Sequence, residues 1–413
     1  MRSYEGFLLE AAERDVVQHL EHIEDAVIDD GSAGAKAALA TLRNIAKVLR
    51  GSSKSKVNIT LKYDGAPSIF AGTDPADGKF FVAKKSIFNK EPKVYKTAEE
   101  VKADTSGDLQ LKMLEALRLL PALGIKGIIQ GDFMFGPGDV KKATIGDASY
   151  VTFHPNTIVY AIPIDTPAAM AVLRAKIGIV WHTTYTGASL STISSQSGNN
   201  IASKLRPSKD VWSVDASIHD ISGRVNMTDA ETKAIDDDLA RLDSLIKETP
   251  AALLNVIASS TDLRSLIKIY ANSKIRASAD TSDSKKYVAD MLVWLNARLD
   301  ADVASKKTPA GQEKYKQKKE SIISPLSKYT ADDLAKIFSL MSIIVQIKLR
   351  LIAKLNETNE MRTFLKTTAG LQSTGHEGYV ISDHLGSSTV KLVDRLNFSR
   401  ANFSPDVIKG WQR

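Results

Sequence analysis

The spacing of apolar residues changes along the chain, and each change predicts a different kind of structure. From residue 4 to about residue 50, apolar positions recur at helical intervals, which predicts helix ending near Gly51. From Val57 to about Tyr185, short runs rich in β-branched and aromatic residues predict strands, with one helix at about 108–120. Helical spacing returns from about 228 to 368, and two strand-like runs, EGYVISD and TVKLVD, follow it.

Turn and cap residues locate several boundaries between these elements. Asp77 and Gly78 lie between SIFAGT and KFFVAK and predict a hairpin whose loop has two residues or more. Thr228 is followed three residues later by Glu231, a capping box that predicts the start of a helix. Thr330 precedes a long apolar helix with acidic residues in its first turn and basic residues near its end.

Together these elements predict an α+β protein built on mainly antiparallel sheet. A helical segment at 1–50 precedes a β-rich domain, whose first part spans 51–215. An all-helical insertion at 216–370 interrupts that domain, and the strands within 371–413 complete it.

Composition narrows the functional classes. The chain of 413 residues contains no cysteine, which excludes disulfides and thiolate chemistry and suits a reducing cytoplasm. The first residues carry acids throughout and are expected to form an amphipathic helix, not a signal peptide, and no apolar run reaches membrane-spanning length. A net charge of +7 is compatible with a polyanionic partner and equally with an ordinary basic protein.

Lys62 stands at a predicted strand end, in the run LKYDG, where a lysine can act as a nucleophile. Partial burial or a neighbouring cation would lower the pKa of such an amine. Gly65 allows a sharp turn and close approach of a ligand, and Asp64 could orient a ribose or the lysine. The alternative is a hairpin turn that carries a solvated lysine.

LKYDG resembles motif I of the covalent nucleotidyltransferase superfamily, which includes polynucleotide ligases and mRNA capping enzymes. Further runs resemble the later motifs of that superfamily in the expected order. The runs and the residues that they supply are GIIQGDFMF with Asp132, TIVYAIPID with Tyr160 and Asp165, HEGYVIS with Glu377 and Gly378, and STVKLVD with Lys391. The resemblance covers about 57–185 and 375–398, and it implies an antiparallel nucleotidyltransferase (ATP-grasp-like) domain.

The resemblance also implies chemical roles. Lys62 would attack the α-phosphorus of ATP and form a lysyl-AMP, and Lys391 would contact the α-phosphate. Lys84 and Lys85 would point to opposite sides of a strand, and Lys85 is our choice for a second phosphate contact. Asp132 and Glu377 would hold Mg²⁺ or Mn²⁺, or would position the lysine and the ribose.

The nucleotide base would be recognised by two residues. Tyr160 would stack on the adenine, unless its ring belongs to the core, and Thr60 would read the purine from its place two residues before Lys62. With Asp64 and Gly65, these residues complete the expected nucleotide-binding site.

Three departures bear on the subclass. Pro67 stands where ligases and capping enzymes often have arginine, Asp132 replaces a glutamate, and Val393 replaces a second lysine, for which Arg395 could substitute. About twenty residues follow Lys391, too few for the oligonucleotide-binding barrel of DNA ligases and capping enzymes. RNA ligases vary more at the position of Pro67 and often lack the barrel, so the resemblance favours ATP-dependent RNA ligases. The chain also resembles proteins of tailed bacteriophages, which would act in the host cytoplasm.

The resemblance therefore predicts a monomeric RNA ligase that seals 5′-phosphate to 3′-hydroxyl ends. Two alternatives to this prediction remain. The first is a DNA ligase or a capping-type guanylyltransferase that uses the same lysine. The second is a non-catalytic nucleic-acid-binding protein with a decayed site, for which Pro67 and Val393 are the main indications.

A lysine-rich run in the helical insertion could contact phosphates of a nucleic acid, with RNA favoured over DNA. A solvated helical face is the alternative. The lysines are Lys306, Lys307, Lys314, Lys316, Lys318 and Lys319. His182, in IGIVWHTTY, is expected to be structural, because ligase chemistry assigns no histidine there.

Overall fold

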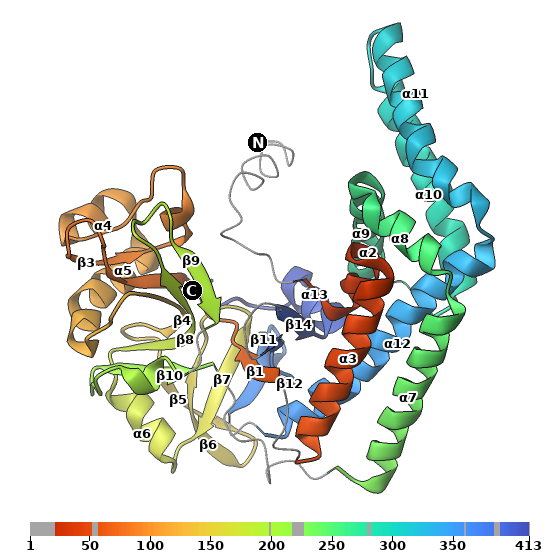
Figure 1. The fold of residues 1–413 in the computed structure, drawn as a ribbon. Coiled ribbons are helices and arrows are strands. Elements are labelled where there is room, and N and C mark those ends of the chain that lie inside the picture. The colour runs from red at the N-terminus through yellow and green to blue at the C-terminus, as the bar shows by residue number, and fades with distance from the viewer. Residues whose placement is uncertain are drawn as a thin grey trace.

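The computed structural model describes residues 21–51, 57–197, 200–216, 227–277, 279, 282–358, 361–383 and 389–412. Its elements form a helical body on one side and three β-sheets on the other (Figure 1). The helix expected from residue 4 is described only from residue 21 onward; its earlier part lies outside the described residues.

The helical body joins two parts of the chain that are far apart in sequence. Ile45, Leu242 and Ile344 are fully buried in one continuous apolar core, so the described helices of the N-terminal segment and of the insertion form one unit, whereas two units were expected. Figure 1 shows α3 beside α7 and α12. The helices are α2 (Ala26–Asp29), α3 (Gly31–Leu49), α7 (Asp229–Glu248), α8 (Ala251–Ser259), α9 (Thr261–Arg276), α10 (Ser284–Ala304), α11 (Pro309–Ile323) and α12 (Ala331–Asn356).

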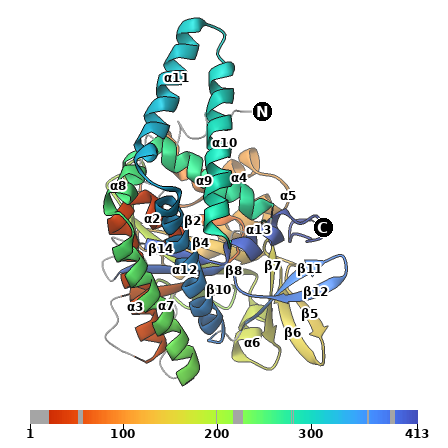
Figure 2. The ribbon, with the colours of Figure 1, turned by 90° about the vertical axis from the view of Figure 1, so that its right-hand side faces the viewer.

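Predicted caps begin two of these helices. Thr228 and Glu231 form a reciprocal capping box at the start of α7, and Thr330 forms one with Asp333 at the start of α12. Apolar residues of α12 that recur at helical spacing face the core, as expected for the long helix. Helices α10 and α11 project from the body as a hairpin (Figure 2).

A three-stranded antiparallel sheet connects the helical body to the rest of the molecule. Its order is β1 (Val57–Lys62), β13 (Gly378–Asp383) and β14 (Thr389–Val393). Because side chains alternate along a strand, Leu61, Tyr379 and Leu392 pack on the helical core. Residues such as Lys62 and Lys391 therefore point to the opposite face.

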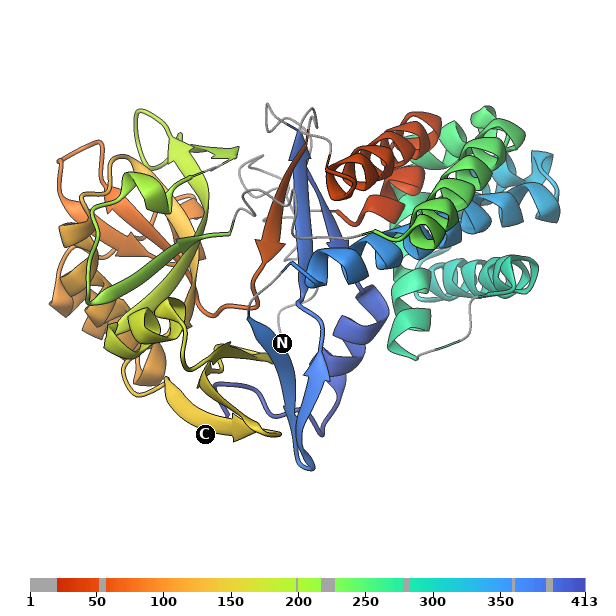
Figure 3. The ribbon, with the colours of Figure 1, turned by 90° about the horizontal axis from the view of Figure 1, so that it is seen from below.

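A six-stranded sheet lies across from this one (Figure 3). One face packs against α4 (Ala98–Asp104) and α5 (Gly107–Leu119), where Ile129 and Trp181 meet Met113. The order is β10 (Val211–Asp215), β8 (Ile177–Thr186), β4 (Ile128–Phe135), β2 (Ser68–Thr73) and β3 (Phe80–Ala83), with β9 (Ser194–Ser197) paired to β8. All pairs are antiparallel except β10 with β8.

The predicted hairpin of Asp77 and Gly78 joins β2 and β3. Its loop runs from Asp74 to Lys79, and Gly78 adopts a positive φ of 70°. The hairpin prediction is thus confirmed with the longer loop.

The third sheet contains one strand, at residues 362–367, that was expected to belong to the helical insertion. Thr363 pairs with Tyr160, so the chain returns to sheet before residue 371. The order is β12 (Gly370–Thr374), β11 (Arg362–Thr367), β7 (Ile158–Pro163), β6 (Ala148–Phe153) and β5 (Lys141–Ile145). Helices α6 (Pro167–Arg174) and α13 (Arg395–Phe403) lie beside the sheets. The chain also forms short 3₁₀ turns, which are η1 (Ile23–Asp25), η2 (Lys85–Phe88), η3 (Leu120–Leu123), η4 (Ala202–Lys204) and η5 (Ser324–Lys328).

The coarse fold prediction is confirmed: helices combine with mainly antiparallel sheets. Among the described residues no strands close into a barrel, and α13 with a short tail follows Lys391. No described helix is long and apolar enough to cross a membrane.

Candidate functional site

A polar cavity of about 720 Å³ lies between the three-stranded and the six-stranded sheets. Its volume falls in the range of small-molecule and cofactor sites. Residues from β1, β2, β4, β8, β13 and β14 line it, together with the loop after β1. It brings together eight of the predicted site residues, namely Thr60, Lys62, Asp64, Gly65, Lys85, Asp132, Glu377 and Lys391.

Strand alternation explains why the three-stranded sheet contributes polar side chains to this cavity. Thr60 pairs with Val380, and Val380 pairs in turn with Lys391. These side chains share the face opposite the helical core, and Lys62 extends the same row by two residues. The hydroxyl of Thr60 donates to the carbonyl oxygen of Val380 at 3.1 Å, which holds Thr60 at the cavity wall.

Lys62 and Glu377 form an ion pair inside the cavity, although 315 residues separate them in sequence. Lys62 stands opposite Gly378 at the end of β1, which brings its Nζ to Glu377 Oε1. The side chain of Lys62 is 32% exposed and that of Glu377 only 8%. The amine is therefore open to the cavity, while the carboxylate is largely withdrawn from water.

Burial raises the pKa of Glu377 from 4.5 to about 7. The charge of Lys62 opposes this rise, and the nearby carboxylates of Asp64 and Asp132 add to it. A carboxylate in this range can take a proton from a neighbouring amine at neutral pH.

Lys391 adds a second cation near Lys62. Burial lowers the pKa of Lys391, and the positive charge of Lys62 lowers it further. Its backbone N–H donates to the carbonyl oxygen of Glu21 at 3.0 Å, so the segment before η1 lies along the outer edge of β14. Two amines in one cavity favour an anionic ligand between them.

The carboxylate of Asp64 binds the loop that leads into β7, so it is not free to bind a ribose. It accepts hydrogen bonds from the backbone N–H groups of Thr157 and Ile158, at 2.7 and 3.0 Å. The amide of Asn156 donates to it at 2.8 Å. Asp64 is thus a positioning residue that fixes the turn after Lys62.

Tyr160 does not line the cavity, so the prediction that its ring stacks on a base is wrong. The ring is fully buried and stacks on Phe153, with centroids 5.6 Å apart. Its hydroxyl accepts a hydrogen bond from the backbone N–H of Asp64 at 2.7 Å. Phe88 and Tyr185, with ring centroids 5.5 Å apart, are aromatic residues that do line the cavity.

Gly65 is required by close packing. A Cβ at this position would lie 2.6 Å from Asp132 Cβ and 2.9 Å from the carbonyl oxygen of Phe133. The backbone N–H of Ala66 also donates to that carbonyl at 2.9 Å, which fastens the loop to β4. Any side chain here would push the loop after β1 away from β4.

Lys84 and Lys85 follow β3 instead of lying on it, because the strand ends at Ala83. Lys84 points away and pairs with Asp104 at 3.2 Å. Lys85, at the start of η2, lines the cavity. Lys85 and not Lys84 lines the cavity, as expected, but neither lysine lies on a strand.

Asp132 lies on β4 and faces the same cavity, with 24% of its side chain exposed. His182 Nε2 lies 3.6 Å from its Oδ2. Asp165, which followed Tyr160 in the same predicted motif, is exposed in the turn after β7 and does not line the cavity.

His182 lines the cavity, although the sequence predicted only a structural role for it. Gln130 pairs with Thr183, but the next residue, Gly131, pairs with Trp181, so His182 is the extra residue of a β-bulge. A bulge reverses the alternation and turns a side chain to the other face. No local pattern in IGIVWHTTY reveals this bulge, because it depends on pairing with β4.

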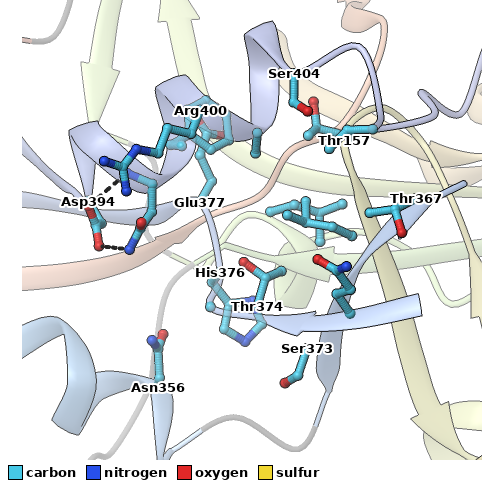
Figure 4. Close-up of a pocket in the computed structure, with 18 of the residues that line it drawn as sticks. Thr157, Asn356, Thr367, Ser373, Thr374, His376, Glu377, Asp394, Arg400 and Ser404 are labelled. Atoms are coloured by element: carbon cyan, nitrogen blue, oxygen red, sulfur yellow. Dashed lines mark hydrogen bonds between the residues drawn. The ribbon is translucent and has the colours of Figure 1, made fainter. Parts of the chain in front are cut away.

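A second cavity, of about 840 Å³, lies on the other side of Glu377. Glu377 and Phe398 line both cavities and so form part of the wall between them. Figure 4 shows Arg400 of α13 and Asp394, the residue that caps this helix, on one side and Thr367 and Ser373 of the β11–β12 hairpin on the other.

The lysine-rich run lies on the α10–α11 hairpin, which projects from the helical body away from the sheets (Figures 1 and 2). Lys318 pairs with Asp262, Lys319 pairs with Asp300, and Lys306 lies 3.9 Å from the ring centroid of Tyr315. The remaining lysines of the run are exposed, and they are Lys307, Lys314 and Lys316.

Arg395 does not replace the missing second lysine. Its guanidinium pairs with Asp25 at 3.0 Å and donates to Asn272 Oδ1 at 2.8 Å, outside the cavity lining. Arg395 instead ties the end of β14 to the helical body.

The fold and the site together define an α+β protein with a lysine–carboxylate cavity between two sheets. The chain belongs to the Family of unknown function (DUF6267), whose model matches residues 17–406. No curated protein and no solved structure matches the chain.

Proposed function

We propose that this chain is an ATP-dependent nucleotidyltransferase of the RNA ligase type, with Lys62 as the residue that carries the nucleotide. The carrying observation is the contact of Lys62 with Glu377 in a cavity that also holds Lys391, Lys85 and Asp132. Residues of these types suit the transfer of a phosphoryl group to an amine.

The first step would load the protein. The proton of the Lys62 ammonium passes to Glu377, and the amine lone pair attacks the α-phosphorus of ATP. A phosphorus–nitrogen bond forms, the bond to the bridging oxygen breaks, and pyrophosphate leaves. The charges of Lys391 and Lys85 stabilise the oxygens on which negative charge develops.

The next two steps would seal a nucleic acid. An oxygen of a 5′-phosphate end attacks the phosphorus of the lysyl-AMP, the phosphorus–nitrogen bond breaks, and the proton held by Glu377 returns to the nitrogen of Lys62. A 3′-hydroxyl oxygen then attacks the activated 5′-phosphate and loses its proton to water, and AMP leaves as the new phosphodiester forms.

The cavity fits a divalent cation that arrives with the nucleotide. Among the described residues no group of three or more metal-ligating side chains exists, which argues against a cation held by protein ligands alone. Mg²⁺ commonly binds through one or two carboxylates together with substrate phosphates. Asp132 would supply the accessible carboxylate and Glu377 the second, and the cation would neutralise phosphate charge.

The decisive experiment is the intact mass of the purified chain after incubation with ATP and Mg²⁺. We expect a gain of one AMP in the wild type, none in Lys62→Ala, and an unchanged gain in Lys126→Ala. Lys126 is a matched control because it is exposed and does not line the cavity. A wild-type chain that takes up no nucleotide with Mg²⁺ or Mn²⁺ would refute the proposal.

Labelled nucleotides and substrates separate the ligase from its alternatives. Transfer from α-labelled GTP but not from ATP would indicate a guanylyltransferase. Sealing of nicked DNA but not of RNA would indicate a DNA ligase. We expect labelling from ATP and sealing of RNA ends.

A further inference from the structure

Trp411 is an exposed aromatic residue held beside the cavity. The chain has four tryptophans, of which Trp181 is fully buried and Trp212 is 8% exposed. Trp411 is 61% exposed, although tryptophan is highly buried on average. Such a large apolar face in water calls for a physical explanation.

The indole of Trp411 is connected to the cavity wall by hydrogen bonds. Its Nε1–H donates to Asn156 Oδ1 at 3.3 Å, and Asn156 Nδ2 donates to Asp64 at 2.8 Å. Asn156 itself lines the cavity, and Asp64 fixes the turn that follows Lys62. Two hydrogen bonds therefore link the exposed ring to the loop of the proposed nucleophile.

The turn that carries Trp411 is closely fitted to the protein. The backbone N–H of Gly410 donates to the carbonyl oxygen of Asn156 at 2.7 Å. A Cβ on Gly410 would lie only 1.9 Å from the carbonyl oxygen of His154, so glycine alone permits this approach. Lys409 Nζ donates to Thr157 Oγ1 at 3.1 Å and to the carbonyl oxygen of Ala401 at 3.0 Å.

This attachment separates Trp411 from an ordinary mobile tail residue. Chain ends are usually poorly ordered unless they are tied down. Here the contacts fix the ring before a ligand binds, so a base that stacks on it need not also order the side chain. An indole with an exposed face is a sequence-tolerant platform for nucleobases.

We propose that Trp411 is a stacking platform for an unpaired base of the nucleic-acid strand whose end enters the cavity. This inference rests on the proposed function, because that function supplies the nucleic acid. It adds the substrate class: a strand with an unpaired base next to the reacting end, in preference to a fully paired blunt end.

Tryptophan fluorescence tests the platform without any catalytic step. The probe is a single-stranded RNA of about 12 nucleotides with a 5′-phosphate, titrated without ATP. We expect saturable quenching in the wild type and its loss in Trp411→Phe, because the other tryptophans are buried or half-buried. Fluorescence polarisation of a labelled copy of the same RNA should show roughly 5- to 150-fold weaker binding for Trp411→Ala.

Phe403→Ala is the matched control, since Phe403 is 68% exposed, its ring lies under Arg276, and it is not among the residues that line the cavity. We expect Phe403→Ala to bind RNA like the wild type, and blunt duplex RNA to quench less than the single strand. Unchanged quenching in Trp411→Phe, unchanged affinity in Trp411→Ala, or an equal loss in Phe403→Ala would each overturn the platform. The wild-type chain should also gain the mass of one AMP with ATP and Mg²⁺. If that gain is missing from the wild type while quenching holds, the lysyl-AMP proposal fails and the platform stands.

Discussion

Replacing Glu377 by Gln removes a carboxylate whose ionisation the fold opposes. Only 8% of this side chain is exposed, and burial raises its pKa from 4.5 to about 7. Between these two pH values the native chain keeps the proton while the unfolded chain releases it. Raising the pH through this window therefore lowers the free energy of unfolding of the wild type.

The size of the effect follows from the two pKa values. One pKa unit corresponds to 1.36 kcal/mol, so a rise from 4.5 to about 7 corresponds to about 3 kcal/mol. Because Gln cannot ionise, Glu377→Gln does not lose this free energy of unfolding as the pH rises. Relative to the wild type, the variant should gain about 3 kcal/mol of stability between pH 4.5 and pH 8.

Urea denaturation of both proteins at pH 4.5 and at pH 8 measures this quantity as a difference of differences. Groups that titrate equally in both proteins cancel, including the buried histidines. Glu91→Gln is the matched control, because Glu91 is exposed and does not line the cavity. The same Glu377→Gln protein should label with AMP about 10²- to 10⁴-fold more slowly, because Gln cannot accept the proton of Lys62.

A stability difference between Glu377→Gln and the wild type that is equal at both pH values would refute the reasoning. It would mean that Glu377 ionises like a solvated carboxylate and that the cavity does not withdraw it from water. Rapid labelling of Glu377→Gln would separately exclude Glu377 as the proton acceptor.

Three further predictions follow from other contacts. Gly65→Ala should lose about 1–3 kcal/mol in urea denaturation and label poorly, because its Cβ would lie 2.6 Å from that of Asp132; wild-type labelling would contradict this. Lys348→Met should lose about 3–5 kcal/mol in the same assay, because it leaves buried Glu24 without its 2.8 Å partner, and the double variant with Glu24→Gln should recover part of the loss. Replacing the three exposed lysines of the α10–α11 hairpin by alanine should reduce the slope of log affinity for single-stranded RNA against log salt by about 2, with AMP labelling unchanged; an unchanged slope would exclude the hairpin from the RNA interface. The substitutions are Lys307→Ala, Lys314→Ala and Lys316→Ala.

Much of the site could be predicted from short runs of sequence because strand alternation is a local property. Thr60 and Lys62 are two residues apart, so they share a face wherever β1 pairs. The same rule places Val380 and Lys391 on the face of Thr60 once β13 and β14 are recognised as strands. The helix caps at Thr228 and Thr330 were also readable, since a capping box spans only four residues.

Alternation shows which residues share a face but not what that face meets. Tyr160 lies on a strand with two buried faces, and only the packing of Phe153 and the loop at Asp64 puts its ring in the core. His182 enters the cavity through a bulge that exists only because β8 pairs with β4. Trp411 was not singled out at all, because its importance depends on contacts with Asn156.

The sequence by itself determined the kinds of elements, their caps, the polar face of β1 and the lysine that carries the proposed chemistry. Only the tertiary structure decided that the N-terminal helices and the insertion share one core. It also brings Glu377, which the family resemblance assigned to the site of Lys62, into contact with that lysine across 315 residues. The physical reason is the range of the interactions. Helix periods, strand periods and caps depend on neighbours along the chain, whereas burial, bulges and ion pairs depend on residues that only folding brings together.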